Sequence, residues 1–277
     1  MPAKPVFLDD FHFRIGEVPF HCSFQRGRGG EVAAPAGFLA VMKDRSQVDR
    51  YLRLCDELRP QVIVEFGIKW GGSTAFLHAL NQPHLLVSFE LSAEPAPALS
   101  SYIRAHGLES VVKPCYGIDQ ADRTRVAAIM TAELHGRPVD LVIDDASHLL
   151  DQTRASFEMV FPLLRPGGVY VIEDWNADHL VADALDRALA EADAPGRTRL
   201  LAAVEKAVAA KPDRDARLVR LPLELVLARA SKRDAIREIT VMDNWLLIRR
   251  GEEPLDPASF RLADLASDHF GNLRPPD

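Results

Sequence analysis

Short apolar runs alternate with amphipathic stretches through the middle of the chain. The runs read VIVEFG from residue 62, LLVSFE from 85, SVVKPCYG from 110, DLVIDD from 140 and VYVIED from 169. Between them, apolar residues recur three and four positions apart, as in the segment that contains Phe157, Val160 and Phe161. The pattern predicts five buried strands, each separated from the next by a helix.

This alternation also predicts the arrangement of the strands. Strands joined through helices form a parallel sheet that is covered on both faces. Two further runs, EITVM from 238 and WLLIRR from 245, are separated only by Asp243 and Asn244, which suits a tight hairpin. We therefore expect a doubly wound, Rossmann-like α/β fold with a mostly parallel seven-stranded sheet and an antiparallel C-terminal hairpin.

Two segments depart from the alternation. Residues 1–45 are rich in Gly, Pro and aromatic residues without a steady period, and we expect them to form an extension that packs on a main domain of residues 46–277. About sixty residues separate VYVIED from the hairpin, far more than a usual connection. We expect residues 176–235 to form a cap over the site, although a long surface crossover fits the same pattern.

Composition narrows the class of protein. The 277 residues carry a net charge of −7, and this negative charge gives no electrostatic attraction for the phosphate backbone of a nucleic acid. Three scattered cysteines indicate a reducing compartment, and no signal peptide or long apolar span is recognisable. We expect a cytoplasmic protein that has neither a nucleic-acid nor a membrane partner.

A glycine turn, EFGIKWGGS at residues 65–73, follows the first strand and opens a helix, where ligands bind in open α/β sheets. Neither the dinucleotide pattern GxGxxG nor a phosphate-binding loop is present, and Glu65 would repel phosphate but favour an ammonium group. Glu90 ends the second strand, where a carboxylate can accept hydrogen bonds from ribose hydroxyls. The residues indicate a nucleoside ligand that has an amino-acid tail and no phosphate.

Acidic residues end two neighbouring strands. Asp144 and Asp145 end the fourth, and Glu173 and Asp174 end the fifth. The carboxyl ends of parallel strands meet at one edge of a sheet, and crowded carboxylates are relieved by a divalent cation. Oxygen ligands favour Mg²⁺ over Mn²⁺ or Ca²⁺. His148, three residues after Asp145, is a candidate general base.

Structural rather than catalytic interpretations of the same residues stay open. Ser147 or Asp151 could cap the helix that follows, and a lone histidine at a helix start is more often an ordinary polar surface residue. Hydride-transferring Rossmann enzymes are disfavoured by the glycine spacing.

The motifs, in this order, resemble a known family. The glycine turn resembles motif I of class I S-adenosylmethionine (SAM)-dependent methyltransferases, and YGIDQAD at 116–122 resembles their adenine loop, although the family usually has Gly where this chain has Ile118. The layout D-A-S-H followed by E-D resembles the metal-dependent O-methyltransferases of antibiotic biosynthesis, the macrolide-sugar O-methyltransferase and cephalosporin 7-methoxylation group. The resemblance implies cofactor contacts at Glu65, Gly67, Gly71, Gly72, Ser73, Glu90, Asp119, Gln120 and Asp144.

The same resemblance implies a reaction. Asp145, Glu173 and Asp174 would hold Mg²⁺, and His148 would be the base that, with Asp145, acts in methyl transfer from SAM to a hydroxyl of a sugar or other natural product. The implied partner is a small hydroxylated molecule. Two alternatives are a metal-independent SAM methyltransferase and a catalytically idle scaffold with the same fold. The sequence leaves open the identity of the acceptor and whether the chain forms a homo-oligomer.

Overall fold

A seven-stranded sheet forms the centre of the molecule. The computed structural model describes residues 4–25, 30–31, 33–177, 179, 188–190, 193, 197–198, 201–202 and 217–265. The strand order is β12-β13-β11-β10-β7-β8-β9, and β13 runs antiparallel to both neighbours while the other pairs are parallel. The strands are β7 (Val62–Phe66), β8 (Leu85–Glu90), β9 (Val112–Tyr116), β10 (Val139–Asp144), β11 (Leu164–Glu173), β12 (Ile236–Val241) and β13 (Trp245–Arg250). The expected fold class and hairpin are confirmed.

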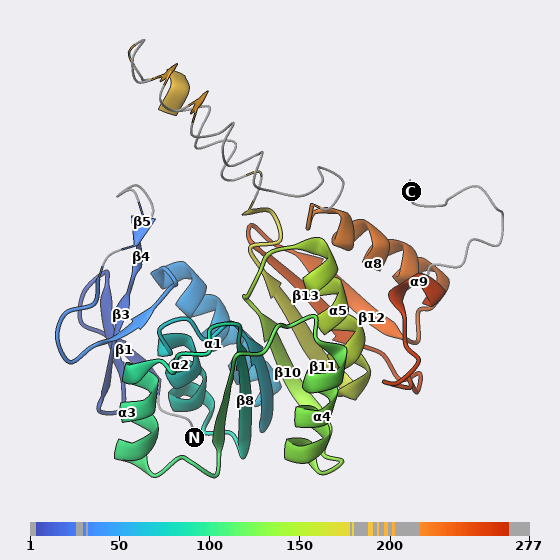
Figure 1. Cartoon of the computed structure of the whole chain (residues 1–277), viewed down its shortest axis with the longest axis horizontal. Coiled ribbons are helices and arrows are strands. Elements are labelled where there is room, and N and C mark those ends of the chain that lie inside the picture. The colour runs from blue at the N-terminus through green and yellow to red at the C-terminus, as the bar shows by residue number, and fades with distance from the viewer. Residues whose placement is uncertain are drawn as a thin grey trace.

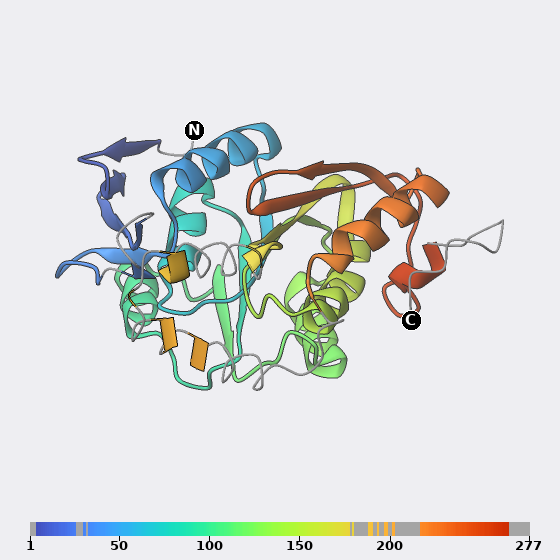
Figure 2. The same ribbon diagram turned by 90° about the horizontal axis from the view of Figure 1, so that it is seen from above.

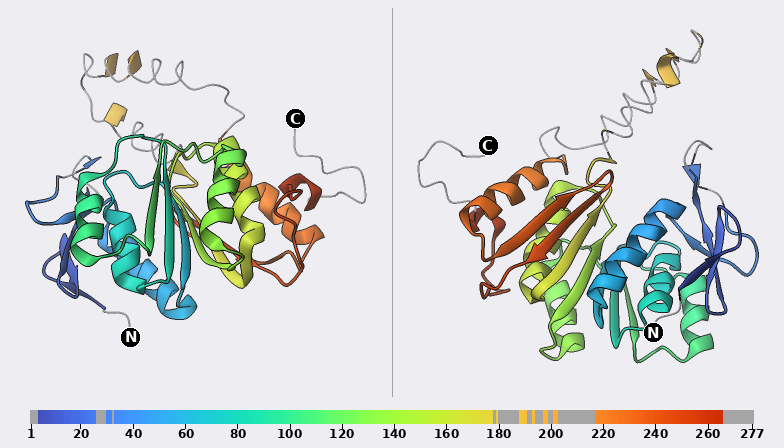
Figure 3. Two further views of the ribbon diagram at one scale, coloured as in Figure 1. Left: turned by 60° about the horizontal axis from the view of Figure 1, so that its bottom comes forward. Right: turned by 180° about the vertical axis from the view of Figure 1, so that it is seen from behind.

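Helices cover both faces of this sheet, as Figures 1 and 3 show. The helices are α1 (Arg45–Leu58), α2 (Gly72–Asn81), α3 (Pro97–His106), α4 (Arg123–Leu134), α5 (Leu150–Val160), α8 (Arg220–Ser231) and α9 (Leu262–Leu265), with a 3₁₀ turn η1 (Phe161–Leu163). Alternate residues of β7 face opposite layers: Ile63 packs with α1, α2 and α3, whereas Val62 and Val64 pack with α4, α5 and α8. Burial on both faces explains why the strands read as continuous apolar runs.

The N-terminal segment forms a small sheet of its own. Its strands β1 (Pro5–Phe7), β2 (His12–Ile15), β3 (Val18–Cys22) and β6 (Leu39–Val41) pair in that order, and β4 (Phe24–Gln25) pairs with β5 (Gly30–Glu31). Phe13 and Phe20 pack edge-on against Phe76 of α2. The sequence did not predict these short strands, because their hydrophobic and polar residues follow no clear period. Figure 2 shows them at one end of the molecule, with α8 and α9 at the other.

The segment expected to form a cap lies largely outside the described residues. Its described C-terminal part, α8, buries Leu221, Leu225 and Ala228 in the layer that also contains α4 and α5. That part of the segment therefore belongs to the core rather than to a cap. One contact does reach the strand tips, because Arg217 forms a β-bridge with Leu149, beside His148.

Among the residues that the structure describes, no helix is long and apolar enough to cross a membrane.

Candidate active site

The glycine turn and the acidic loop meet at the carboxyl edge of the sheet. Gly67 donates its backbone N–H to Phe89 O (2.9 Å), and Asp145 donates its own to Phe66 O (3.0 Å), so the tips of β7, β8 and β10 are joined. Gly67 has φ +98°, and a Cβ there would lie 2.3 Å from the carbonyl oxygen of Asp145. Only glycine permits this close approach.

Glu90 secures the glycine turn at the end of β8. Its carboxylate accepts backbone N–H bonds from Ile68 (3.1 Å), Lys69 (2.8 Å) and Ser92 (2.9 Å). Lys69 adopts φ +49°, a left-handed conformation that is uncommon for residues other than glycine. Glu90 is half-buried at the mouth of the turn, where its remaining lone pairs can accept from a ligand's hydroxyls.

Glu65 lies beneath the turn rather than at its surface. Its side chain is 1 % exposed and accepts hydrogen bonds from Thr74 Oγ1 (2.6 Å) and Ser88 Oγ (2.8 Å). Burial raises the pKa of Glu65, and hydrogen bonds from Thr74, Ser73 and Ser88 oppose that shift. Its observed contacts are therefore hydroxyl groups of α2 and β8.

Gly71 and Gly72 leave room for neighbouring elements. A Cβ on Gly71 would lie 2.3 Å from Leu99 Cβ of α3, and one on Gly72 would lie 1.7 Å from Ala40 O of β6. Gly71 is the N-cap of α2 and provides no side-chain hydrogen bond. The first amides of α2 thus lack a side-chain cap, which suits the carboxylate of an amino-acid tail.

Asp144 and Gln120 form a buried network behind the site. Asp144 is 2 % exposed and accepts hydrogen bonds from Ser156 Oγ (2.5 Å), Tyr170 OH (2.9 Å) and Gln120 Nε2 (3.2 Å). Gln120 Oε1 accepts the backbone N–H of Ser147 (3.0 Å), which ties the loop after β9 to the loop after β10. Burial raises the pKa of Asp144.

Asp119, the other residue assigned to the adenine loop, lies at the surface. It is exposed and accepts the backbone N–H of Ala121 (2.8 Å). The loop therefore turns one of its two polar residues toward solvent and the other into the protein.

Asp145, His148 and Asp174 converge at the tips of β10 and β11. Each offers one ligand atom, and these atoms all lie within 4.8 Å of one another. His148 Nε2 is 3.9 Å from Asp145 Oδ1. Asp145 and Asp174 offer the oxygen donors that a hard divalent cation prefers, and the imidazole of His148 lies beside them, so the cluster fits a cation with a base next to it.

The backbone at two of these residues is strained. His148 has φ +54° and Asp174 has φ +49°. Left-handed conformations in such residues persist where surrounding contacts enforce them, and they cluster at functional sites. Asp174 is enforced by the β12–β13 turn, because its N–H donates to Asn244 O (2.6 Å) and its Oδ1 accepts from Asn244 Nδ2 (2.8 Å).

Glu173, adjacent to Asp174, has different partners. Its side chain is 1 % exposed and accepts hydrogen bonds from Lys43 Nζ (2.7 Å) and from the hydroxyl of Tyr51. Lys43 Nζ also donates to Asp145 Oδ2 (3.1 Å). Neither Lys43 nor Tyr51 was predicted from the sequence, since Lys43 lies just before a helix start and Tyr51 fits the apolar face of α1.

The buried charges shift one another's pKa values. Burial, followed by the charge of Glu173, raises the pKa of Asp145 to about 7, while Lys43 and His148 act in the opposite direction. Burial lowers the pKa of Lys43, but the charges of Asp145 and Glu173 outweigh it, so the net shift is upward. Burial and the charge of Glu173 raise the pKa of Tyr51. The charges of Asp145 and Glu173 therefore favour the protonated, cationic form of Lys43.

Neither residue considered as a cap of α5 is its N-cap. That position is Leu149, and Ser147 Oγ accepts the N–H of Leu149 (3.2 Å) one residue before the helix begins. Asp151 is in the first turn, where it is exposed and pairs with Arg154 (2.9 Å).

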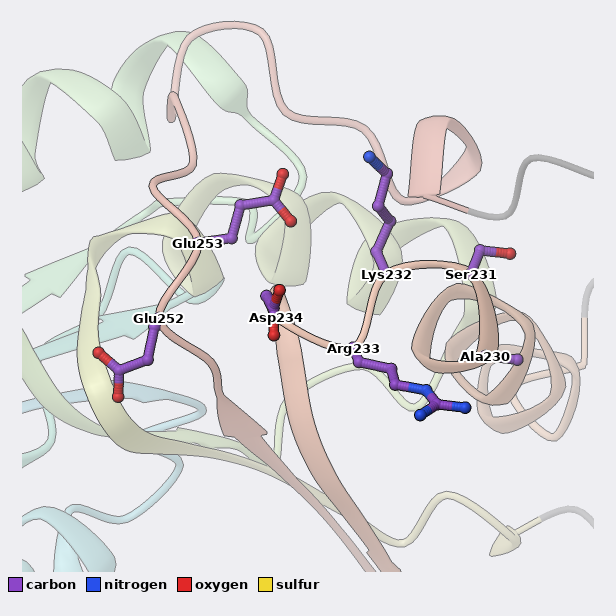
Figure 4. Close-up of a pocket in the computed structure, with 7 residues that line it drawn as sticks. All are labelled: Ala230, Ser231, Lys232, Arg233, Asp234, Glu252 and Glu253. Atoms are coloured by element: carbon purple, nitrogen blue, oxygen red, sulfur yellow. The ribbon is translucent and has the colours of Figure 1, made fainter.

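A separate cavity lies at the opposite edge of the sheet. It has a volume of about 650 Å³, and Figure 4 shows that its side chains come from the end of α8, from the connection between α8 and β12, and from the segment after β13. Its charged lining mixes Lys232 and Arg233 with Asp234, Glu252 and Glu253. It contains none of the residues predicted from the sequence, and its mixed charges favour no class of ligand.

Comparison with known proteins agrees with this geometry. Residues 64–175 match the family described as methyltransferase domain. Demethylmacrocin O-methyltransferase of Streptomyces fradiae is 41% identical over 78 residues, which are 22% of this chain and 20% of that protein. Rhamnosyl O-methyltransferase of Mycobacterium leprae is 26% identical over 142 residues, 50% of this chain and 58% of that protein. The match therefore spans a fifth of the first relative's length and under two thirds of the second's.

A solved structure has the same fold. The Podospora anserina methyltransferase PaMTH1, bound to SAH, aligns with a TM-score of 0.50 and 17% identity over 76% of this chain and 80% of that chain. The segment from residue 64 to residue 175 is therefore similar to the methyltransferase-domain family, and the chain has the α/β fold of this SAH-bound methyltransferase.

Proposed function

We propose that the chain transfers a methyl group from SAM to a hydroxyl of a small molecule, a sugar or another natural product, with the help of a divalent cation, Mg²⁺. One observation carries this proposal. Asp145, His148 and Asp174 bring one ligand atom each within 4.8 Å of the others, and Asp145 also lies against Gly67 of the glycine turn. The cation and the cofactor would therefore lie side by side, as the reaction requires.

The cofactor would bind along the tips of β7, β8 and β9. Glu90 would accept hydrogen bonds from the ribose, and the uncapped amides at the start of α2 would bind the carboxylate of the amino-acid tail. Asp119, which is exposed, would lie at the adenine end. Glu65, Asp144 and Gln120 would act through the backbone and hydroxyl groups that they bind.

The transfer needs a proton acceptor close to the acceptor hydroxyl. A divalent cation, when bound, lowers the pKa of such a hydroxyl and orients it. In this proposal His148 takes the hydroxyl proton at Nε2, the oxygen forms a bond to the methyl carbon, and the carbon–sulfur bond breaks to release S-adenosylhomocysteine. Asp145, 3.9 Å from that nitrogen, would stabilise the protonated imidazole.

The class of acceptor is proposed from the relatives. One is named for demethylmacrocin and one for a rhamnosyl group, and both are named O-methyltransferases, so each acts on a hydroxyl of its substrate. A vicinal diol would suit this site, because two adjacent oxygens can occupy the positions around a cation that the protein leaves open. We extend the proposal to a role in antibiotic or related secondary metabolism, which the name of another relative, a tetracenomycin-C O-methyltransferase, supports.

The test is release of S-adenosylhomocysteine by the purified chain supplied with SAM and a panel of rhamnosylated acceptors. We expect turnover that EDTA abolishes and Mg²⁺ restores. His148→Ala should lower kcat by about 100- to 10,000-fold and leave S-adenosylhomocysteine affinity unchanged, since the base acts only in the chemical step. Asp151→Asn, an exposed change three residues further along the chain in the first turn of α5, is the matched control and should be neutral.

A second candidate is methyl transfer without a metal. Lys43, which already neutralises part of the charge on Asp145 and Glu173, favours it. Turnover that survives EDTA and Asp145→Ala would support this second reaction. An idle scaffold, by contrast, would show no turnover on any acceptor.

A further inference from the structure

Lys43 places a buried ammonium group between two of the acidic residues of the site. Its side chain is 2 % exposed, and its ammonium group lies 2.7 Å from Glu173 Oε1 and 3.1 Å from Asp145 Oδ2. It also lies 5.1 Å from the ring centroid of Tyr51, whose hydroxyl donates to the same Glu173 oxygen. A cation already lies between two of the three carboxylates that the family resemblance assigns to Mg²⁺.

The backbone around Lys43 is firmly held. On one side, β6 packs so closely on α2 that a Cβ at Gly72 would overlap Ala40 O. On the other side, Asp44 is the N-cap of α1 and forms a capping box with Gln47. The Asp44 carboxylate accepts the backbone N–H of Gln47 (2.9 Å), and Gln47 Oε1 accepts the backbone N–H of Asp44 (2.8 Å). Lys43 therefore cannot leave the two carboxylates by a shift of the chain without loss of these contacts.

The two oxygens of Asp145 have different neighbours. Oδ2 accepts from Lys43, whereas Oδ1 faces His148 at 3.9 Å. Asp174 lies with Asp145 and His148, and its Oδ1 is oriented by Asn244. Glu173, one residue earlier, points to Lys43 and Tyr51 instead. Glu173 thus contacts Lys43, Asp174 lies in the cluster with His148, and Asp145 does both.

We propose that Lys43 keeps Glu173 out of the metal's ligand set, so that the divalent cation is held by Asp145 and Asp174 while Lys43 positions Asp145. This inference rests on the proposed function and deepens it. When all three carboxylates are ionised, as a bound cation would require, they and the lysine carry two net negative charges, which a divalent cation would neutralise. Displacing Lys43 would leave a buried ammonium group without its partners, which is strongly unfavourable.

The decisive variant removes the pair and preserves the charge. Lys43→Met combined with Glu173→Gln deletes one positive and one negative charge, so the net charge of the cluster stays the same. Binding of Mn²⁺, a paramagnetic substitute for Mg²⁺, is measured on the whole chain by electron paramagnetic resonance. We expect the double variant to bind about 10-fold more weakly than wild type, because Lys43 no longer positions Asp145. Asp174→Asn should bind more than about 100-fold more weakly, because loss of a ligand exceeds a change in its surroundings.

Several outcomes would overturn the inference. If Glu173 is a ligand, the double variant will bind Mn²⁺ as weakly as Asp174→Asn does. If the double variant fails to fold, Glu173→Gln alone decides, because it retains an acceptor for Lys43 and Tyr51; a loss within about 10-fold supports the inference and a loss equal to that of Asp174→Asn contradicts it. Wild-type protein that binds no Mn²⁺ would contradict metal dependence itself, and this inference with it.

Discussion

The two halves of the candidate site are assembled in different ways. On the cofactor side, made of the glycine turn at 65–73 with Glu90, partners are near in sequence: Glu90 and Lys69 are 21 residues apart, and Glu65 and Thr74 are 9 apart. On the acid side, made of Asp145, His148, Glu173 and Asp174, partners are distant. Lys43 and Glu173 are 130 residues apart, and Asn244 and Asp174 are 70 apart.

This difference shows which contacts each half depends on. The cofactor side uses the backbone amides and hydroxyls of one strand–helix–strand unit, so it forms wherever that unit folds. The acid side needs the N-terminal sheet to supply Lys43 and the C-terminal hairpin to supply Asn244. Changes to those outer elements should therefore alter cation binding and leave cofactor binding intact.

The largest expected effect comes from the residue that joins the two halves. Gly67→Ala would force a Cβ to within 2.3 Å of Asp145 O and would separate the turn from the acidic loop. A misplacement of about 1 Å costs on the order of 100-fold in catalysis, so affinity for S-adenosylhomocysteine and for Mn²⁺ should both fall, with turnover lower by at least this factor. Calorimetry and turnover assays measure the three quantities.

Gly107→Ala is the control for Gly67→Ala. Gly107 also has positive φ, +64°, but nothing lies within 4 Å of a Cβ there. It should lose about 1 kcal/mol of stability and no binding. Equal effects of the two substitutions would mean that backbone strain, rather than the contact with Asp145, explains the loss.

A smaller and one-sided effect is expected from Asn244→Ala. The Asn244 side chain donates to Asp174 Oδ1 (2.8 Å), and residues that orient a ligand typically contribute about 10- to 100-fold to metal affinity. Mn²⁺ affinity should fall by that factor, while affinity for S-adenosylhomocysteine stays constant. Asn176→Ala, which removes a contact with Asp243 O of the same turn, should change Mn²⁺ affinity less. A parallel loss of cofactor affinity would contradict the independence of the two halves.

The smallest effect concerns stability on the cofactor side. Burial raises the pKa of Glu65, so the folded protein holds that proton more tightly than the unfolded chain does. The resulting stability is complete below the unfolded pKa and is lost as pH rises through the folded pKa. The free energy of unfolding of the wild type should therefore fall between about pH 5 and about pH 8. Glu65→Gln should make this fall smaller, by roughly 1.4 kcal/mol for each pH unit that separates the pKa of Glu65 in the folded protein from its pKa in the unfolded chain.

Chemical denaturation at the two pH values measures this difference. Glu94→Gln, on the exposed loop after β8, serves as the control and should leave the pH dependence as it is in the wild type. A Glu65→Gln curve that is parallel to the wild-type curve would show that Glu65 ionises at its ordinary pKa.

Local patterns in the sequence account for the sheet and for part of the site. Continuous apolar runs predicted the strands because both faces of the sheet are buried, and the turn between EITVM and WLLIRR predicted the antiparallel β13. Asp145 and Asp174 do come together, as parallel strand ends must. The N-terminal sheet was not predicted, because its strands are short and their burial against α2 depends on tertiary contacts rather than on period.

Residue type and order along the chain were thus enough to indicate the α/β fold, the glycine turn and the acidic strand ends, since each of these depends on neighbours a few positions away. They could not show that Glu173 is bound by Lys43 and Tyr51 while Asp174 faces His148, although the two acids are adjacent. Successive residues at a strand end point in different directions, and the groups they meet come from distant segments. The direction of each carboxylate, and so its chemistry, therefore depends on the packing of the complete chain.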